Sequence, residues 1–188
     1  MKSILAIIAA VLTIATALPG RAQSPSSSPK AAHPAAKPVA DPALIDLAGY
    51  NDIIAKYRGK PLVVNFWATW CEPCRAEYPM IVELAKEYGP KGVSVIGVSL
   101  DDDSDMNLVR RFIARNQPGF PNYRQKPGID MNSFYQGVSS AWHGTMPATF
   151  FYTRDGKLAG NFEGTRPREV FEGVFRALLS GSGAGTGK

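Results

Sequence analysis

Cysteine is scarce in this sequence, and its scarcity limits what the protein can be. Only 2 of the 188 residues are cysteines, and both lie within Trp70-Cys71-Glu72-Pro73-Cys74. A small fold held together by several disulfides needs more cysteines, spread along the chain. A disulfide between these two would close a ring so small that it would add little stability through chain entropy. The pair is therefore expected to serve a reactive function rather than a structural one.

A strong excess of one charge is also missing. The chain has 21 Lys and Arg against 16 Asp and Glu, a formal net charge of +5, and its basic residues are scattered. Because nucleic-acid binding normally shows as a basic patch or stripe, we expect no nucleic-acid partner. A zinc site would need a second closely spaced pair of Cys or His, which the sequence does not offer. We expect no metal, no cofactor and a monomeric protein.

No apolar run in this sequence reaches the length of an ordinary membrane span. The longest, residues 4–18, would extend only ~22 Å as a helix, against a hydrocarbon core of ~30 Å. Lys2 precedes the run, and Pro19 and Gly20 end it, a pattern typical of an export signal. We expect residues 1–22 to be a cleaved signal peptide, favoured over an N-terminal anchor. The protein is then expected in the periplasm or at the extracytoplasmic face of the membrane.

Composition divides the rest of the chain into three parts. Residues 23–42 are rich in Pro, Ser and Ala and have almost no large apolar side chain, which predicts a linker. Residues 181–188 alternate glycine with other residues, which predicts a flexible tail. Residues 43–180 carry the periodic apolar pattern of one folded domain.

Within that domain, strand and helix patterns alternate. Residues 62–67, Leu-Val-Val-Asn-Phe-Trp, form a nearly continuous apolar run, which is typical of a strand buried on both faces. The other expected elements are helices at 51–58, after 70 up to 88, at 105–116, near 131–136 and at 168–179, and strands at 93–100, 148–152 and 157–162, the last two forming a hairpin. This order predicts an α/β fold with a mixed central β-sheet flanked by helices on both faces.

Two finer expectations concern the helices. Aspartates at 101–103, together with Asp105, follow the strand at 93–100, and we expect them to cap the next helix. Two apolar stripes are expected to face the core, namely Leu108, Phe112 and Ile113 in one helix, and Val170, Val174 and Leu178 in the last.

The position of the Cys-x-x-Cys motif, between a strand and a helix, predicts different chemical roles for its two cysteines. Cys71 falls near the helix N-cap, where free N–H groups and the helix dipole stabilise a thiolate and lower its pKa. We therefore expect Cys71 to be the attacking nucleophile. Cys74 lies about one turn further on, within reach of a mixed disulfide, and is expected to be the resolving thiol. Pro73 suits the first turn because it lacks an N–H that would find no partner there.

The residues around the pair carry a family resemblance. The stretch 64–79, VNFWATWCEPCRAEYP, resembles the thioredoxin superfamily, as do Gly-Lys-Pro at 59–61 and Pro-Ala-Thr-Phe at 147–150. Within it, residues 44–179 look like the TlpA/ResA/DsbE branch of exported, membrane-associated thiol-disulfide oxidoreductases. The resemblance implies a thioredoxin-like fold and a reductant of the cell envelope. Such a protein passes electrons from a membrane thiol donor to oxidised client proteins, of which apocytochrome c is the best-known type.

The resemblance also implies where a client binds. Pro147 matches the superfamily's cis-proline, and a cis bond before proline costs little compared with other residues. It is expected to lie beside the cysteines and to present the backbone of Met146 to an incoming peptide in strand fashion. Trp70, Glu72 and Pro73, within the motif itself, complete the expected client-binding surface.

Glu77 matches the active-site glutamate of the branch. It lies three residues beyond Cys74, and a partly buried carboxyl group has a raised pKa and can exchange protons with that thiol. Asn65 stands where cytoplasmic thioredoxins carry a buried, proton-relaying aspartate, and an amide cannot titrate. Together with the resemblance, these residues favour a reducing pair whose proton relay is Glu77.

Two other activities stay open at this stage, and a third is excluded. A Cu(I) site of the Sco kind could use both thiolates with a methionine or with His143, although Sco proteins have three residues between their cysteines. A DsbA-like oxidant would share the fold but usually has a large helical insertion, for which this chain has no room. A peroxidase of the peroxiredoxin type would need a Pro-x-x-x-Thr-x-x-Cys pattern, which is absent. We expect His143 to be a surface residue.

Overall fold

A computed structural model describes residues 40–181 of the protein. The expected signal peptide at 1–22, most of the expected linker and most of the expected tail lie outside these residues. None of the helices between residues 40 and 181 combines the length and the apolar character that a membrane crossing requires.

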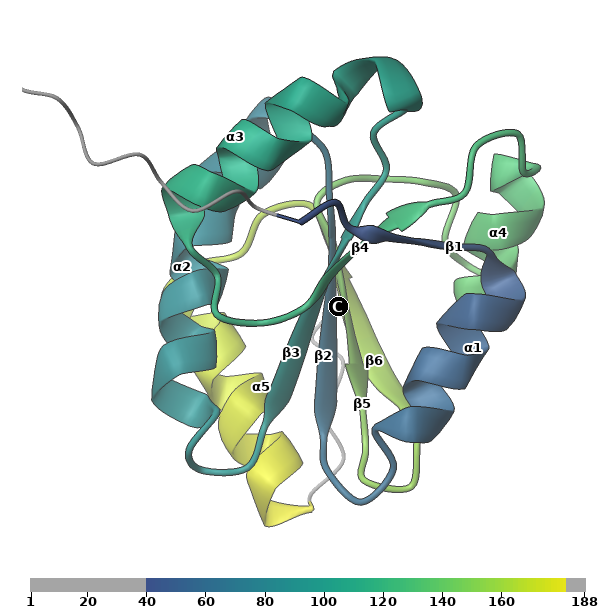
Figure 1. Cartoon of the computed structure of the whole chain (residues 1–188). Coiled ribbons are helices and arrows are strands. Elements are labelled where there is room, and N and C mark those ends of the chain that lie inside the picture. Colours follow the sequence, from purple (N-terminus) through teal and green to yellow (C-terminus); the bar gives the residue numbers. More distant parts are fainter. Residues whose placement is uncertain (1–39, 182–188) are drawn as a thin grey trace, which may run out of the picture. The chain divides into compact units, whose positions relative to one another are not determined.

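A mixed sheet of six strands forms the middle layer of residues 40–181 (Figure 1). Its order is β1-β4-β3-β2-β5-β6, in which β2 runs parallel to β3 and antiparallel to β5. The strands are β1 (Ala43–Ile45), β2 (Leu62–Trp67), β3 (Ser94–Ser99), β4 (Asn122–Gln125), β5 (Ala148–Tyr152) and β6 (Leu158–Glu163). The helices are α1 (Leu47–Lys56), α2 (Glu72–Tyr88), α3 (Met106–Asn116), α4 (Met131–Val138) and α5 (Arg168–Ser180), with a 3₁₀ turn η1 (Asp103–Asp105) before α3. The predicted α/β fold with a mixed sheet is confirmed.

Helices cover both faces of the sheet, as predicted. Figure 1 shows α1 and α4 on one face, and α2, α3 and α5 on the other. Side chains alternate along β2, so Val64 and Phe66 pack in the cluster of α1 and α4, while Val63 and Trp67 pack on the opposite side. Asn65 lies between these last two, on the face that α2 covers.

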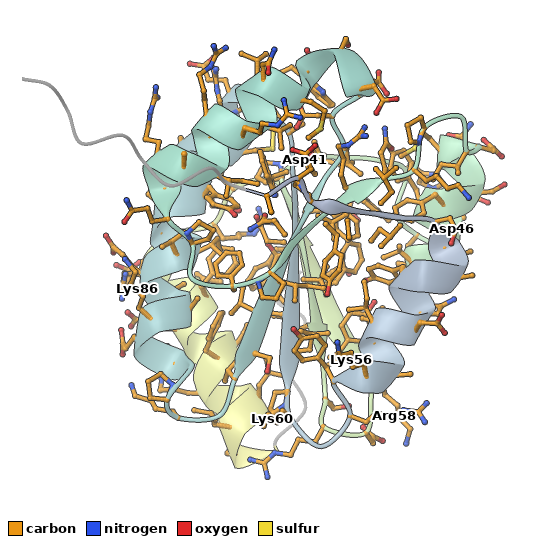
Figure 2. The ribbon with its side chains drawn as sticks, viewed as in Figure 1. Asp41, Asp46, Lys56, Arg58, Lys60 and Lys86 are labelled. Atoms are coloured by element: carbon orange, nitrogen blue, oxygen red, sulfur yellow. A yellow bond between two sulfur atoms is a disulfide. The ribbon has the colours of Figure 1, made fainter. Side chains whose placement is uncertain are left out.

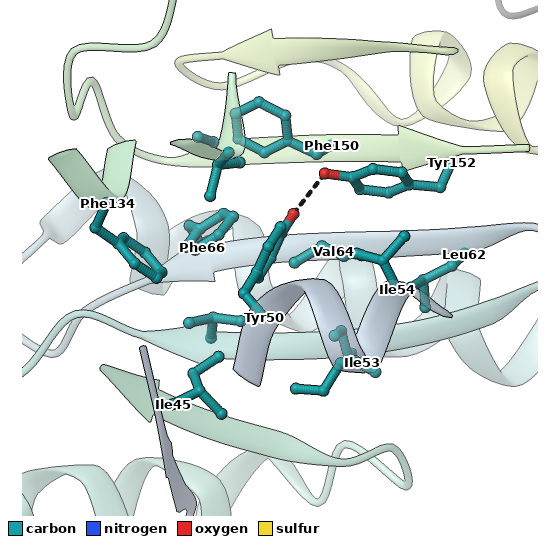
Figure 3. Packing of buried hydrophobic residues seen from close by; sticks show 14 of the residues in the cluster. Ile45, Tyr50, Ile53, Ile54, Leu62, Val64, Phe66, Phe134, Phe150 and Tyr152 are labelled. Carbon is teal, nitrogen blue, oxygen red and sulfur yellow. Dashed lines mark hydrogen bonds between the residues drawn. The ribbon is translucent and has the colours of Figure 1, made fainter. Parts of the chain in front are cut away.

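Aromatic rings fill the layer between the sheet and α1 (Figure 3). Tyr50 of α1 lies against Phe66, and its hydroxyl oxygen is 2.7 Å from that of Tyr152. Phe134 of α4 meets Phe66 edge-on, with ring centres 6.2 Å apart. Because the two tyrosine hydroxyls share a hydrogen bond, part of the cost of burying them is compensated.

A capping aspartate sets the start of α1. Asp46 Oδ1 accepts a hydrogen bond from the backbone N–H of Gly49 at 3.0 Å, and Lys56 lies in the last turn. Figure 2 shows these two charged residues at opposite ends of the helix, where they complement its dipole. The helix therefore begins at Leu47, four residues before the predicted start at 51.

Strand register brings three segments to one edge of the sheet. The last residue of β2, Trp67, pairs with Ser99 at the end of parallel β3, and Phe66 pairs with Ala148, the first residue of antiparallel β5. The segments after β2, after β3 and before β5 therefore meet at this edge. The first of them continues into the cysteine motif, and the third contains Pro147.

The two predicted inward stripes are each wrong at one position. Leu108 is 44% exposed and Val170 is 41% exposed. In α3 the core position next to Leu108 is taken by Val109, and in α5 Phe171 and Phe175 are fully buried. Burying the larger rings of α5 removes more apolar surface from water, which turns Val170 to the solvent side.

Candidate redox site

The two cysteines form a disulfide at the start of α2. Cys71 is the N-cap residue, as predicted, and its Sγ accepts a hydrogen bond from the backbone N–H of Cys74 at 3.3 Å. Pro73 lies in the first turn. Because the free N–H groups of a helix start point at the N-cap, a negative charge on the Cys71 sulfur is stabilised there.

One side of the motif faces solvent. Cys71 is 6% exposed and Cys74 is 2% exposed, so Cys71 is the more accessible of two largely buried residues. Trp70 is 63% exposed, and Glu72 and Pro73 are exposed as well. These three side chains are the neighbours of Cys71 that an approaching molecule can contact.

The loop before β5 closes over the disulfide. The peptide bond between Met146 and Pro147 is cis, as predicted, and Met146 packs against the apolar cluster that contains both cysteines. The loop is fastened on both sides, because Trp142 Nε1 donates to the carbonyl of Thr145 at 2.9 Å and the carbonyl of Pro147 accepts from the N–H of Gly164 at 2.8 Å. The backbone beside the disulfide is therefore held in place by hydrogen bonds.

Glu77 lies one helical turn after Cys74 on the buried face of α2. It is only 6% exposed, and burial raises its pKa from 4.5 to about 7, while the N–H and the charge of Arg166 oppose the rise. Its Oε2 accepts a hydrogen bond from the backbone N–H of Arg166 at 3.3 Å. Since Gly164 and Arg166 belong to the same segment between β6 and α5, that segment contacts both Glu77 and the cis-proline loop. A carboxyl group with this pKa exchanges protons near neutral pH.

Asn65 is buried in β2, beneath α2. Its Nδ2 donates to Thr149 Oγ1 at 3.0 Å, across the pairing of β2 with β5. Its Oδ1 has no hydrogen-bond partner among residues 40–181. This position on the α2 face therefore holds a polar group that cannot take up or release a proton at ordinary pH.

Asp101 is a site residue whose place the sequence analysis did not predict. It is fully buried after β3, and its carboxylate accepts hydrogen bonds from the backbone N–H of Thr69, at 2.9 and 3.0 Å to its two oxygens. The hydroxyls of Thr69 and Ser99 also donate to it. The carboxylate thus ties the segment that leads into Cys71 to the end of β3.

The predicted capping role of the aspartates is wrong. Neither Asp102, the N-cap of η1, nor Asp105, the N-cap of α3, makes a side-chain capping hydrogen bond. Asp101 instead points back to the neighbouring strand end, and Asp103 pairs with the buried Arg124. The partners of these carboxylates lie across the sheet edge, so spacing along the chain does not reveal them.

His143 is exposed in the loop before the cis-proline, as predicted. Between residues 40 and 181, no three His, Cys, Asp or Glu side chains are gathered as metal ligands would be.

Comparison with known proteins agrees with this geometry. Residues 36–160 match the model of the AhpC/TSA family. The chain is 32% identical to the thiol-disulfide oxidoreductase ResA of Bacillus cereus over 133 residues, which is 71% of this chain and 72% of that protein.

Solved structures show the same fold. A candidate thiol:disulfide interchange protein DsbE from Chlorobium tepidum aligns with a TM-score of 0.56 at 26% identity, over 67% of this chain and 84% of that one. A secreted Mycobacterium tuberculosis disulfide oxidoreductase homologous to DsbE of E. coli aligns with a TM-score of 0.52 at 23% identity, over 65% of this chain and 85% of that one. The resemblance noted from the sequence is confirmed. The chain belongs to the AhpC/TSA family, as a thioredoxin-like thiol-disulfide oxidoreductase of the TlpA/ResA/DsbE kind.

Proposed function

We propose that the protein reduces disulfides of client proteins in the cell envelope, with Cys71 as nucleophile and Cys74 as resolving thiol. The observation that carries this proposal is the position of the pair. Cys71 caps the start of α2 and is the more exposed cysteine, while Cys74 lies behind it in the first turn. The N-cap stabilises the thiolate that must attack, and burial keeps the second thiol for the intramolecular step.

The reaction proceeds by two exchanges. The Cys71 thiolate of the reduced protein attacks one sulfur of the client disulfide, which forms a mixed disulfide and releases the other client sulfur as a thiolate. Cys74 then loses its proton and attacks the Cys71 sulfur. This step closes the Cys71–Cys74 disulfide and releases the second client thiol, so two electrons pass from the protein to the client. A membrane thiol donor restores the dithiol by the same exchanges in reverse.

Glu77 is proposed to accept the Cys74 proton. It lies on the same face of α2, one turn away, and its pKa of about 7 lets it take up a proton near neutral pH. Asn65 offers no such group on the sheet below. The carboxyl group of Glu77 is therefore the proton acceptor that the site supplies for the resolving step.

The direction and the place of the reaction are part of the proposal. The apolar run at 4–18 supports export to the periplasm or the outer side of the membrane. The 32% identity with ResA supports thiol-disulfide exchange, and the resemblance to the TlpA/ResA/DsbE branch supports the reducing direction. The resemblance to the TlpA/ResA/DsbE branch supports oxidised proteins of the apocytochrome c type as clients. The exposed Trp70, Glu72 and Pro73 and the loop at Met146 and Pro147 are the proposed client-binding surface.

Trapping tests the proposal. A Cys74→Ala variant should stop at the mixed disulfide and accumulate client adducts that dithiothreitol releases. The matched control is Cys71→Ala, which lacks the nucleophile and should accumulate none. Reduction of insulin by the wild-type dithiol should be lost in both variants. Equal trapping by both variants, or no adduct with Cys74→Ala, would contradict the assigned roles.

A further inference from the structure

A pocket of about 310 Å³ lies beside the redox motif, and three arginines line it. Arg75 comes from the start of α2, while Arg111 and Arg115 lie one turn apart on α3. The remaining lining residues are Thr69, Leu108 and Phe112. The lining therefore combines three positive charges with an apolar wall and contains no acidic side chain.

The three guanidinium groups lack partners. Within residues 40–181, no ion pair or hydrogen bond engages the side chain of Arg75, Arg111 or Arg115. Their neighbour Arg110 differs, because its Nε and Nη2 bind the two carboxylate oxygens of Asp41 at 2.6 and 2.8 Å. Figure 2 labels Asp41 on the short stretch that leads into β1. Three like charges around one pocket repel one another, and bound carboxylates would relieve that repulsion.

The apolar residues of the pocket include one ring packed against the core and others that are exposed to solvent. Phe112 stacks on the buried Trp67 with ring centres 4.6 Å apart, which fixes the floor. Leu108 is 44% exposed at the rim, and Trp70, directly after Thr69, is 63% exposed. Arginine beside an exposed aromatic side chain such as Trp70 is a composition enriched at the centres of protein interfaces.

The pocket is coupled to the reactive sulfurs through the backbone. Thr69 precedes Cys71 by two residues, and the buried carboxylate of Asp101 holds its N–H. Arg75 directly follows Cys74, and its N–H donates to the carbonyl of Cys71 at 3.1 Å. A chain whose disulfide meets Cys71 would therefore pass the pocket within a few residues of its own cysteine.

We propose that this pocket binds an acidic segment of the partner protein, next to the partner cysteine that exchanges with Cys71. The inference rests on the proposed function. Arginine pairs with carboxylates through two parallel hydrogen bonds, which gives orientation as well as attraction. Positive charge beside the reacting sulfur also steers acidic partners during approach, so the effect falls on the association rate and weakens with salt.

Two matched peptides test the inference. Each contains one disulfide, and one carries three Glu beside a cysteine where the other carries three Gln. The reduced protein should react about fivefold faster with the Glu peptide at low salt, and the ratio should fall toward one at high salt. The ratio should also fall toward one in Arg111→Gln/Arg115→Gln, and below one in Arg111→Glu/Arg115→Glu. Using the ratio cancels any change in thiol reactivity.

The matched control is Arg110→Gln, on the same helix but paired with Asp41, which should keep the wild-type ratio. A ratio near one in the wild type, or an unchanged ratio in the double variants, overturns the inference. A cysteine-free Glu peptide, titrated into the oxidised protein by calorimetry, separates the two proposals. If neither disulfide peptide reacts, the proposed function fails, and the titration alone tests the pocket. Binding of the Glu peptide that is lost in Arg111→Gln/Arg115→Gln would support the proposed acidic-segment site. No binding at low salt would overturn that site.

Discussion

Replacing Glu77 by Gln should change how the stability of the protein depends on pH. Burial holds the pKa of Glu77 at about 7 in the folded protein, against 4.5 for the ordinary group. Between these values the unfolded chain loses the proton while the folded protein keeps it, so the free energy of unfolding falls as the pH rises. The difference corresponds to at most about 3 kcal/mol. Local relaxation and water penetration on ionisation reduce the expected loss to about 2 kcal/mol.

The Gln variant is neutral at every pH and should lack this loss. Its stability relative to the wild type should therefore increase by about 2 kcal/mol between about pH 4.5 and pH 7.5. Urea unfolding of both oxidised proteins across this range measures the difference, with Glu72→Gln as a control at an exposed position of the same helix. Parallel pH profiles for wild type and Glu77→Gln would refute the reasoning, because Glu77 would then titrate as an ordinary surface carboxylate.

Three further outcomes follow from the site. Glu77→Gln should slow release of the client from the mixed disulfide by about tenfold or more near neutral pH, because the resolving thiol loses its proton acceptor; stopped-flow release of a labelled peptide measures this, and an unchanged rate would remove the relay. Iodoacetamide at neutral pH should label Cys71 of the reduced protein well before Cys74, as peptide mapping would show; equal labelling would undo the assignment of the nucleophile. Asp101→Asn should lower the free energy of unfolding by about 2 to 4 kcal/mol, because the amide cannot accept from all the donors of Thr69 and Ser99. Ser99→Ala, which removes one of these donors, should lower the free energy of unfolding by about 1 kcal/mol. Equal losses in the two variants would contradict the role of the Asp101 carboxylate in holding Thr69 to the end of β3.

The parts of the fold predicted from sequence are those with strong local signals. The continuous apolar run predicted β2 with its observed bounds, and the cysteine spacing at the start of a helix predicted α2 up to Tyr88. The two short strands β1 and β4 were not predicted. β4 has the polar sequence Asn-Tyr-Arg-Gln, yet it buries Arg124 and Gln125. Their side chains donate to the carbonyls of Asp101 and Leu100, so distant backbone groups compensate part of the burial, while Arg124 Nε and Gln125 Oε1 have no hydrogen-bond partner within residues 40–181.

In the candidate site too, the features with local sequence signals were predicted and a contact between distant segments was not. The positions of Cys71 and Cys74 at the helix start, the cis bond at Pro147 and the burial of Glu77 were expected from the motif and its resemblance. Asp101 was interpreted as a helix cap because it follows a strand and precedes a helix. Its partner Thr69 lies 32 residues earlier, and only the parallel pairing of β2 with β3 brings the two together.

The reduction potential of the Cys71–Cys74 pair tests the central claim most directly. Equilibration of the protein against glutathione buffers of known ratio, read by alkylation of the reduced form, gives the potential. The account predicts a reducing value, more negative than about −200 mV and thus in the range of glutaredoxins and thioredoxin. A value near about −120 mV, that of the oxidant DsbA, would contradict it, because the pair would then draw electrons from clients instead of supplying them.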